Sequence, residues 1–292
     1  FDLPPAGSLL LNVTSFPQKM PLKSETAQMN MVSSLDAVTV KRLAPNVLTI
    51  DYCDLKMNGE TQNDIYVFNA AEKLFRNVGF NKQPWVREVQ YKTDIIDRNN
   101  FTNDTGFEAT YNFYIEPGIE TSSLRAVAER PELWKLSING TIVNPNPGES
   151  WLDRAFGVYN IGDLVVEGIN KVTLIASKMS VFSELEAIYI LGEFNLNSQE
   201  KGWRLAPQSL LSLGNWNKQG MPFYSDGVSY TKAFHIQPGD NSYIVSAPFW
   251  EGSVVNVQVN KKDAGIIGWQ PNELDVTDFI KDGKNEISLI VI

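Results

Sequence analysis

The sequence predicts an all-β protein made of two antiparallel β-sandwiches in tandem, with one short helix in the first. Three observations predict this fold class: a domain-sized internal repeat, apolar residues that alternate with polar ones inside each copy, and turn residues that end the alternating runs. The chain has 292 residues, of which 43% are hydrophobic and 20% charged, so it can bury the cores of two domains.

The repeat is clearest where each copy ends. Residues 160–177 (NIGDLVVEGINKVTLIAS) align without a gap with residues 275–292 (DVTDFIKDGKNEISLIVI), 115 positions later. Upstream, residues 111–118 (YNFYIEPG) align with 232–239 (KAFHIQPG) at an offset of 121. The first copy therefore holds six extra residues, which we place in the Pro-, Gly- and Asn-rich stretch TIVNPNPGES. A period of about 120 residues is that of whole domains.

Inside each copy the apolar residues have a period of two, which is typical of half-buried strands. The runs WKLSI at 134–138 and VNVQV at 255–259 both alternate in this way. Asn139-Gly140 follows the first run, and Asn260-Lys261 follows the second. Asn-Gly favours a type I′ turn, because that turn needs positive φ at both central residues. We therefore expect a β-hairpin at the same place in each copy.

The closing phrase of each copy predicts a turn followed by a final strand. In the first copy Asp163 and the pattern Gly168-x-Asn170 come before KVTLIA, and in the second Asp278 and Gly283-x-Asn285 come before EISLIVI. Asp, Gly and Asn are turn-forming residues, and the apolar runs after them are typical of buried strands.

One segment, NAAEKLFRNVGF, has helical rather than strand periodicity. Its apolar residues lie at i, i+3, i+4 and i+7, which predicts an amphipathic helix over 70–78 that packs on the first sandwich. Asn69 is suited to cap its start, and Gly79 to end it in a left-handed conformation.

Composition excludes several classes of function. The formal charge of −9 and the absence of a Lys/Arg stripe argue against a nucleic-acid partner. No apolar run approaches the roughly 18 residues of a membrane span. Cys53 is the only cysteine, so the chain forms no internal disulfide and no thiolate metal cage. Its strand-like setting, VLTIDYCDL, favours a buried, inert thiol.

The residues of the repeat resemble the sugar-binding β-sandwich domain of glycoside hydrolase family 2, a galactose-binding-domain-like jelly roll. In the second copy the resemblance is carried by Phe234, Ile236, Val257, Val259, Asn260, Asp275, Thr277, Asp278, Gly283 and Asn285. It recurs more loosely in Phe113, Ile115, Leu136, Ile138, Asn139, Gly140, Asp163, Gly168 and Asn170. The first copy departs from the pattern at Ile161-Gly162-Asp163, where the family has V-T-D.

A second resemblance covers more of the chain. NVLTIDYCDLKMNGE, GFNKQPWVREVQYK, RPELWKLSING, AIYILGEFNL and LGNWNKQGMPFYSDGVSY are similar to the region downstream of the catalytic module in bacterial α-L-rhamnosidase-like glycoside hydrolases. The resemblance implies a periplasmic or extracellular bacterial protein, involved in polysaccharide degradation, whose catalytic carboxylates belong to an upstream domain. The chain begins at Phe1 and not at Met, which agrees with an upstream part.

We expect no catalytic residue in this chain by itself. A glycosidase needs an acid and a nucleophile or base at a set separation, and turn chemistry accounts for most of the acidic residues here. His235 is the only histidine, and its strand setting, KAFHIQP, favours an ordinary structural role over catalysis. We expect no bound metal or cofactor. The polar segment DRNNFTND (97–104) could coordinate a structural calcium, but it fits a solvated loop better.

Sugar binding calls for aromatic residues in loops, because sugar rings stack on them. The loop-like aromatic candidates are Trp151, Trp216, Tyr224, Trp250 and Trp269. Each of them could instead fix a loop to the core or pack against a neighbouring domain. The carbohydrate would be a plant or host glycan.

The expected domains are a lead-in segment at 1–44, a first jelly roll at 45–192 and a second at 193–292. The lead-in could end a preceding domain or add a strand to the first sandwich. The favoured function is a non-catalytic accessory region of a bacterial glycoside hydrolase, which supports the catalytic module and could bind carbohydrate. The alternatives are a stand-alone carbohydrate-binding protein and a purely structural spacer or adaptor.

Overall fold

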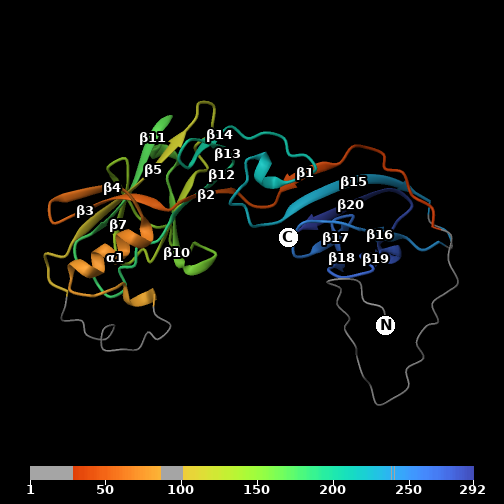
Figure 1. Ribbon diagram of the computed structural model, residues 1–292. Helices are drawn as coiled ribbons and strands as arrows, with labels where there is room; N and C mark the ends of the chain where they lie inside the picture. Colours follow the sequence, from red (N-terminus) through yellow and green to blue (C-terminus); the bar gives the residue numbers. More distant parts are fainter. Residues whose placement is uncertain (1–28, 87–100, 238, 240) are drawn as a thin grey trace, which may run out of the picture. The chain divides into compact units, whose positions relative to one another are not determined.

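The computed structural model describes residues 29–86, 101–237, 239 and 241–292. The chain divides into two compact units, each an all-β sandwich (Figure 1). The first sandwich comprises residues 45–209 and 214–224. The second comprises residues 225–292 with 210–213 and the described part of 1–44. In the described residues, no helix is both long enough and apolar enough to cross a bilayer.

Two sheets enclose the core of the first sandwich. The larger has the order β13-β14-β5-β11-β7-β8, and β3 joins it by pairing with β5 and with β4. Its strands are β3 (Tyr52–Met57), β4 (Glu60–Tyr66), β5 (Phe107–Ile115), β7 (Lys135–Ile138), β8 (Thr141–Val143), β11 (Gly168–Ala176), β13 (Asn195–Ser198) and β14 (Trp203–Ala206). The facing sheet has the order β2-β12-β6-β10-β9, from β2 (Asn46–Ile50), β6 (Arg125–Glu129), β9 (Ser150–Trp151), β10 (Asp153–Asn160) and β12 (Ile188–Gly192).

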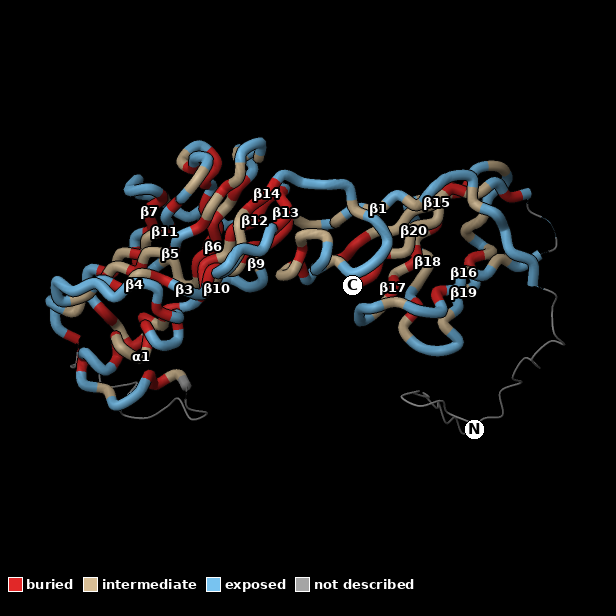
Figure 2. Tube along the Cα trace, turned by 45° about the horizontal axis from the view of Figure 1, so that its top comes forward, coloured by how far each residue is buried: buried red, intermediate tan, exposed pale blue. Residues whose placement is uncertain are grey.

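One continuous core lies between these sheets and extends under the helix. Its largest side chains with almost no exposure include Tyr111, Tyr159, Phe75 and Phe194. Figure 2 shows the buried residues concentrated in the strands and the exposed ones in the connecting loops. Burial of one such side chain contributes about 1.5–3 kcal/mol, so packing of the two sheets accounts for most of the stability of this unit.

The expected helix is present as α1 (Val67–Asn77), and it begins three residues earlier than expected. Asn69 does not cap it: the N-cap is Tyr66, which makes no side-chain capping bond. The helix continues directly from β4, and the backbone N–H of Val67 donates to the carbonyl of Asp51 (2.9 Å), which replaces a side-chain cap. The end is as expected, since Gly79 has φ +90° and its N–H donates to the carbonyl of Arg76.

The second sandwich has one large sheet and one small one. The large sheet has the order β1-β15-β20-β17-β18, from β1 (Thr39–Arg42), β15 (Val228–Ile236), β17 (Val255–Val259), β18 (Lys262–Ile267) and β20 (Gly283–Val291). The small sheet pairs β16 (Ile244–Ser246) with β19 (Glu273–Asp275). Five strands form the corresponding small sheet of the first sandwich, so in the described residues the second sandwich is the smaller of the two.

Two of the expected domain boundaries differ from the contacts in the structure. The lead-in supplies β1, which pairs with β15 in the second sandwich and not with the first. The chain after residue 193 continues in the first sandwich, because β14 pairs in parallel with β5 through Leu205 and Ile115. A short apolar run such as WRLA does not encode its partner strand, and both differences arise from long-range pairing.

The internal repeat is present in the structure with both of its offsets. β5 and β15 are nine-residue strands 121 positions apart, and β11 and β20 are nine-residue strands 115 positions apart. The short helices η3 (Gly162–Leu164) and η5 (Thr277–Phe279) also correspond at 115. Both hairpins are formed: φ is positive at Asn139 and Gly140, and again at Asn260 and Lys261.

The closing phrase of each copy is fixed by a buried asparagine. Asn170 accepts from the backbone N–H of Val166 (2.9 Å) and donates to the carbonyls of Val166 and Gly168. It also accepts from Nδ2 of Asn139 in the β7–β8 turn (2.9 Å). The repeated Gly-x-Asn is therefore structural: it closes the bend before β11 and connects that bend to the hairpin.

The second copy has the same arrangement. Asn285 accepts from the N–H of Lys281 (3.0 Å) and donates to the carbonyls of Lys281 and Gly283. Nδ2 of Asn260 donates to Oδ1 of Asn285 at 2.9 Å. Both Asn170 and Asn285 have no exposed surface, so each amide is satisfied entirely by protein groups.

Candidate functional site

Two adjacent loops of the second sandwich carry the two most exposed aromatic side chains of the described residues. Phe249 is 81% exposed in the loop between β16 and β17, and Trp269 is 67% exposed in the loop between β18 and β19. Trp250 follows Phe249 and is half-buried. An apolar surface of this kind on a loop is typical of a binding site.

The roots of these two loops are fastened to each other at both ends. At one end the backbone N–H of Ala247 donates to the carbonyl of Asn272 (3.0 Å), next to the pairing of β16 with β19. At the other end Val255 pairs with Ile267 across β17 and β18. Phe249, Trp250 and Trp269 therefore belong to one end of the sandwich. We name this set the loop aromatics.

Trp216 and Tyr224 lie together in the first sandwich. Trp216 begins the short helix η4 (Trp216–Gln219), and its ring meets that of Tyr224 edge to face at 6.1 Å. Tyr224 is buried, and the segment is held to the sandwich by Asn46, whose Nδ2 donates to the carbonyls of Gly220 and Phe194. The contact with the buried Tyr224 indicates that this pair fixes a loop to the core.

Trp151 lies on the outer face of the five-stranded sheet, where it meets two aromatic residues that the sequence analysis did not single out. Its ring is 4.9 Å from that of Tyr189 on β12 and 6.4 Å from that of Phe156 on β10. The three rings pack on a small satellite core that includes Val127. All three are half-buried, so they present ring edges and partial faces. We name these rings the Trp151 cluster.

Carboxylates lie near one ring of the Trp151 cluster: burial, followed by Glu186 and Glu129, raises the pKa of Tyr189. Burial, followed by repulsion from Glu186 and Glu129, raises the pKa of Glu184 to about 7. The pKa of Glu186 is raised by burial and by Glu129, and that of Glu129 by burial against the opposing effect of Arg130. Glu129 raises the pKa of both Glu184 and Glu186, and Glu186 raises that of Glu184, so the three carboxyl groups lie near one another.

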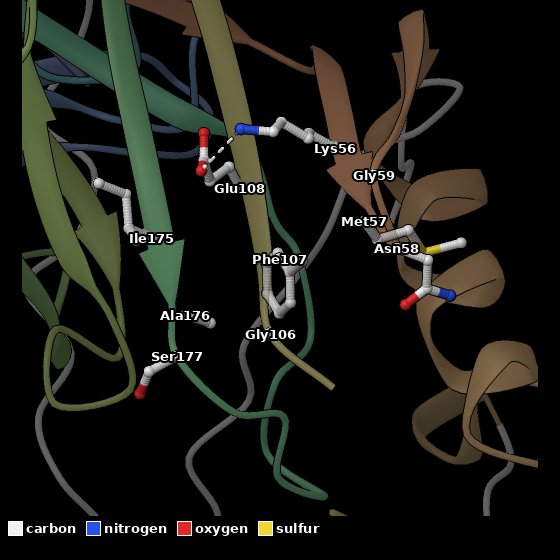
Figure 3. Close-up of a pocket in the computed structure, with 10 residues that line it drawn as sticks. All are labelled: Lys56, Met57, Asn58, Gly59, Gly106, Phe107, Glu108, Ile175, Ala176 and Ser177. Carbon is white, nitrogen blue, oxygen red and sulfur yellow. Dashed lines mark hydrogen bonds and ion pairs between the residues drawn. The ribbon is translucent and has the colours of Figure 1, made fainter. Parts of the chain in front are cut away.

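The cavity shown in Figure 3 is of another kind. It has a volume of about 290 Å³ and lies where β3, β5 and β11 end, lined by Met57, Phe107 and Ile175 among others. Its charged groups, Lys56 and Glu108, are already paired at 3.1 Å. The two charged groups that line the cavity are therefore not free to act on a ligand.

The residues suited to nucleophilic or metal chemistry are few. Cys53 is 2% exposed, and burial with the nearby Asp54 raises the pKa of its thiol to about 12, so the reactive thiolate is suppressed. His235 is exposed on β15. Within the described residues no group of three or more His, Cys, Asp or Glu side chains is placed to hold a metal ion. Residues 97–100 of the possible calcium segment lie outside the described residues.

Phe249, Phe156, Tyr189 and the three glutamates were not predicted from the sequence. Phe249 had a signal, because APFWEG places two aromatic residues side by side in a loop. Phe156 and Tyr189 lie in strands, where aromatic residues predict core packing, and only the sheet order shows that they share an outer face with Trp151.

No family model matches the chain, and no curated protein matches it. Solved structures similar to it include a β-D-mannosidase from Dictyoglomus thermophilum (TM-score 0.33, 12% identity, 84% of this chain and 31% of that one). A rhamnosidase from Novosphingobium sp. PP1Y has a TM-score of 0.23 and 14% identity, with 64% and 18% covered. A GH2 β-galacturonidase from Eisenbergiella tayi has a TM-score of 0.26 and 9% identity, with 91% and 38% covered. The chain thus spans well under half the length of each of these structures.

Proposed function

We propose that this chain is a non-catalytic accessory region of a bacterial glycoside hydrolase of the rhamnosidase-like kind, acting in the periplasm or outside the cell. In this proposal its two galactose-binding-type sandwiches support a catalytic module on the same polypeptide. The second sandwich also holds carbohydrate, through the loop aromatics.

The observation that carries the proposal is the paired asparagine contact in both sandwiches. Asn139 with Asn170, and Asn260 with Asn285, are among the residues in which the sequence resembles the glycoside hydrolase family 2 sandwich. In both units they make the same set of bonds. The resemblance therefore rests on residues that determine the fold, and such residues support a common type of domain better than scattered identities do.

Carbohydrate binding is supported by the exposure of Phe249 and Trp269. Aromatic rings bury large apolar areas and cost little conformational entropy when a ligand covers them. Two exposed rings on fastened loops can stack on the C–H faces of sugar units. Gln270 and Glu251, which lie beside them in sequence and are exposed, can bond to sugar hydroxyls.

The test is binding and hydrolysis by the chain on a panel of soluble plant and host polysaccharides. We expect retardation in affinity electrophoresis by at least one glycan and no release of reducing sugar. The Phe249→Ala/Trp269→Ala variant is expected to lose the retardation, and Leu210→Ala, which removes a 99% exposed side chain elsewhere, is expected to keep it. Hydrolysis by this chain, in a preparation free of other enzymes, would overturn the non-catalytic assignment. Absence of binding to every glycan would favour a spacer.

A further inference from the structure

Strand register places Glu129, at the end of β6, beside the segment that leads into β12 and carries two further glutamates. Tyr189 on β12 pairs with Val127 on β6, so continuation of this register places Glu129 opposite Ala187, next to Glu186. On its other side Glu129 pairs with Phe156 of β10. Glu129 therefore lies between Phe156 and the segment that carries Glu184 and Glu186.

The carboxylates of Glu129 and Glu186 have no direct partner of opposite charge. Neither accepts a hydrogen bond or forms an ion pair within the described part of the chain. Glu132 and Asp153 add further negative charge near Glu129. The nearby cation, Arg130, opposes the rise in the pKa of Glu129, but it also faces other groups: its Nε lies 3.1 Å from Glu132, and its guanidinium lies 4.7 Å from the ring centre of Phe182.

The buried side-chain amide of Gln83, next to Glu184, lacks one hydrogen-bond donor in the described part of the molecule. Gln83 is 2% exposed, and its Nε2 donates to Oε1 of Glu184 at 2.5 Å. Its Oε1 has no hydrogen-bond partner among the described residues. An unmet acceptor in a buried amide is destabilising, so a ligand that brings hydrogen-bond donors is favoured there.

The segment that carries Glu184 is held firmly. Nε1 of Trp85 donates to the carbonyl of Val181 (2.7 Å), and the rings of Trp85 and Phe182 stack at 5.9 Å. On the other side the hydroxyl of Tyr111 donates to the backbone carbonyl of Glu186 (2.8 Å). The backbone that carries Glu184 and Glu186 is therefore held in place before any ligand arrives, which lowers the entropy cost of binding.

Aromatic rings lie along the same face. Tyr189 senses the charges of Glu186 and Glu129, and its ring contacts both Trp151 and Phe156. Acceptor-rich carboxylates beside aromatic rings suit a ligand that has a positive charge, several donors and an apolar face. An ammonium group has three donors and no acceptor, and a sugar ring has an apolar C–H face.

We propose that this face of the first sandwich binds the free amino groups of an amino-sugar oligosaccharide. Glu129, Glu184 and Glu186 surround the ammonium, Gln83 Oε1 accepts one of its hydrogens, and Trp151 and Tyr189 contact the ring. The proposal rests on the carbohydrate-binding function proposed above and adds a second site with a different ligand class.

The experiment is calorimetric titration of the whole chain with a glucosamine hexamer and with its fully N-acetylated counterpart, at about pH 6 where the amines are charged. We expect binding of the glucosamine hexamer and at least tenfold weaker binding of the acetylated one. Glu184→Gln and Glu186→Gln should each weaken binding of the glucosamine hexamer about tenfold. Glu60→Gln, which removes an exposed carboxylate from β4, should leave it unchanged.

Protonation provides a second readout. An ammonium beside Glu184 favours its ionised form, so binding releases a proton, and the measured heat changes with the ionisation enthalpy of the buffer. Glu184→Gln should reduce that dependence, and circular dichroism confirms that each variant is folded. Equal affinity for the two hexamers, or binding insensitive to both glutamate variants, overturns the proposal.

Two further outcomes separate this proposal from the one on which it rests. Equally tight binding of a lysine hexamer, displaced by the glucosamine hexamer, would show a charge-only surface and overturn the sugar assignment. A neutral glycan could bind the wild type and Glu184→Gln but not Phe249→Ala/Trp269→Ala. That result supports carbohydrate binding by the loop aromatics, whatever the affinities for the two hexamers are. No binding of the glucosamine hexamer, with neutral binding intact, overturns the second site alone.

Discussion

Nδ2 of Asn139 donates to Oδ1 of Asn170 at 2.9 Å, and the same bond joins Asn260 to Asn285 at the same distance. In both sandwiches the pair connects the turn of a hairpin to the bend before the strand that pairs with it. The turn asparagine also accepts a hydrogen bond from a backbone N–H of the final strand. Asn139 Oδ1 accepts from Lys171, and Asn260 Oδ1 accepts from Glu286. In each sandwich, one asparagine pair therefore fixes the connection between the hairpin and the final strand.

Replacement of the buried asparagine should be costly. Asn170→Ala and Asn285→Ala each leave an N–H and two carbonyls without their side-chain partner, so we expect a loss of about 3 kcal/mol of unfolding free energy. Urea denaturation measures the loss, and hydrogen exchange with mass spectrometry should place it in the sandwich that carries the substitution.

The matched control is Asn81→Ala, which removes an exposed asparagine and should change the free energy by less than about 0.5 kcal/mol. Combining Asn139→Ala with Asn170→Ala should give a coupling energy of about 1 kcal/mol in a double-mutant cycle. Simple additivity of the two substitutions would contradict the paired bond.

Trp216 should matter for stability and not for glycan binding. Its ring packs against the buried Tyr224, so Trp216→Ala should destabilise the 214–224 segment of the first sandwich by about 2 kcal/mol. Thermal unfolding measures this effect. A Trp216→Ala variant of unchanged stability that no longer binds glycan would contradict the structural role.

Glu184 should make stability depend on pH. Its pKa is raised from 4.5 to about 7 by burial, Glu186 and Glu129, so folding disfavours its charge. The contribution of the neutral acid is fully present below pH 4.5 and is lost as pH rises through about 7. Relative to wild type, Glu184→Gln should therefore gain about 1 kcal/mol between pH 5 and pH 8, a figure reduced for solvent screening at a half-buried group.

Urea denaturation of both proteins at four pH values tests this. Glu129 and Glu186 are present in both proteins, so the difference between the two unfolding free energies reports the contribution of Glu184. A difference in unfolding free energy between the two proteins that stays constant from pH 5 to pH 8 would contradict the prediction. Glu60→Gln serves as the exposed control, with curves that stay parallel to wild type.

Cys53 should be unreactive in the folded protein. Its thiol is buried and its pKa is raised to about 12, so both access and ionisation oppose attack. We expect a thiol reagent to modify no cysteine at pH 8 under native conditions and one per chain in denaturant. Fast modification of the native protein would show that β3 opens locally.

Local pattern sufficed for the repeat, the hairpins and the helix. Positive φ at Asn139 and Gly140 follows from residues adjacent in sequence, and so does the helix end at Gly79. Strand partners that are distant in the sequence could not be predicted from local pattern. The pairing of β1 with β15, and of β14 with β5, depends on which sheet edges the three-dimensional fold brings near these strands.

The candidate sites divide in the same way. Trp250 and Trp269 could be named from their loop settings, and the pairing of Val255 with Ile267 in the β17–β18 hairpin brings their loops together. The glutamates around Gln83 could not be found, because Glu129 is 55 positions from Glu184 and only the β6–β12 register brings them together. Burial is the largest cause of their raised pKa values, and residue identity alone does not specify burial.

The most direct test of the proposed function is affinity electrophoresis of the wild-type chain and the Phe249→Ala/Trp269→Ala variant on a panel of soluble polysaccharides. We predict that at least one glycan retards the wild type, that the folded variant migrates freely, and that no reducing sugar is released. Retardation of both proteins to the same extent, or of neither by any glycan, would contradict carbohydrate binding by the second sandwich.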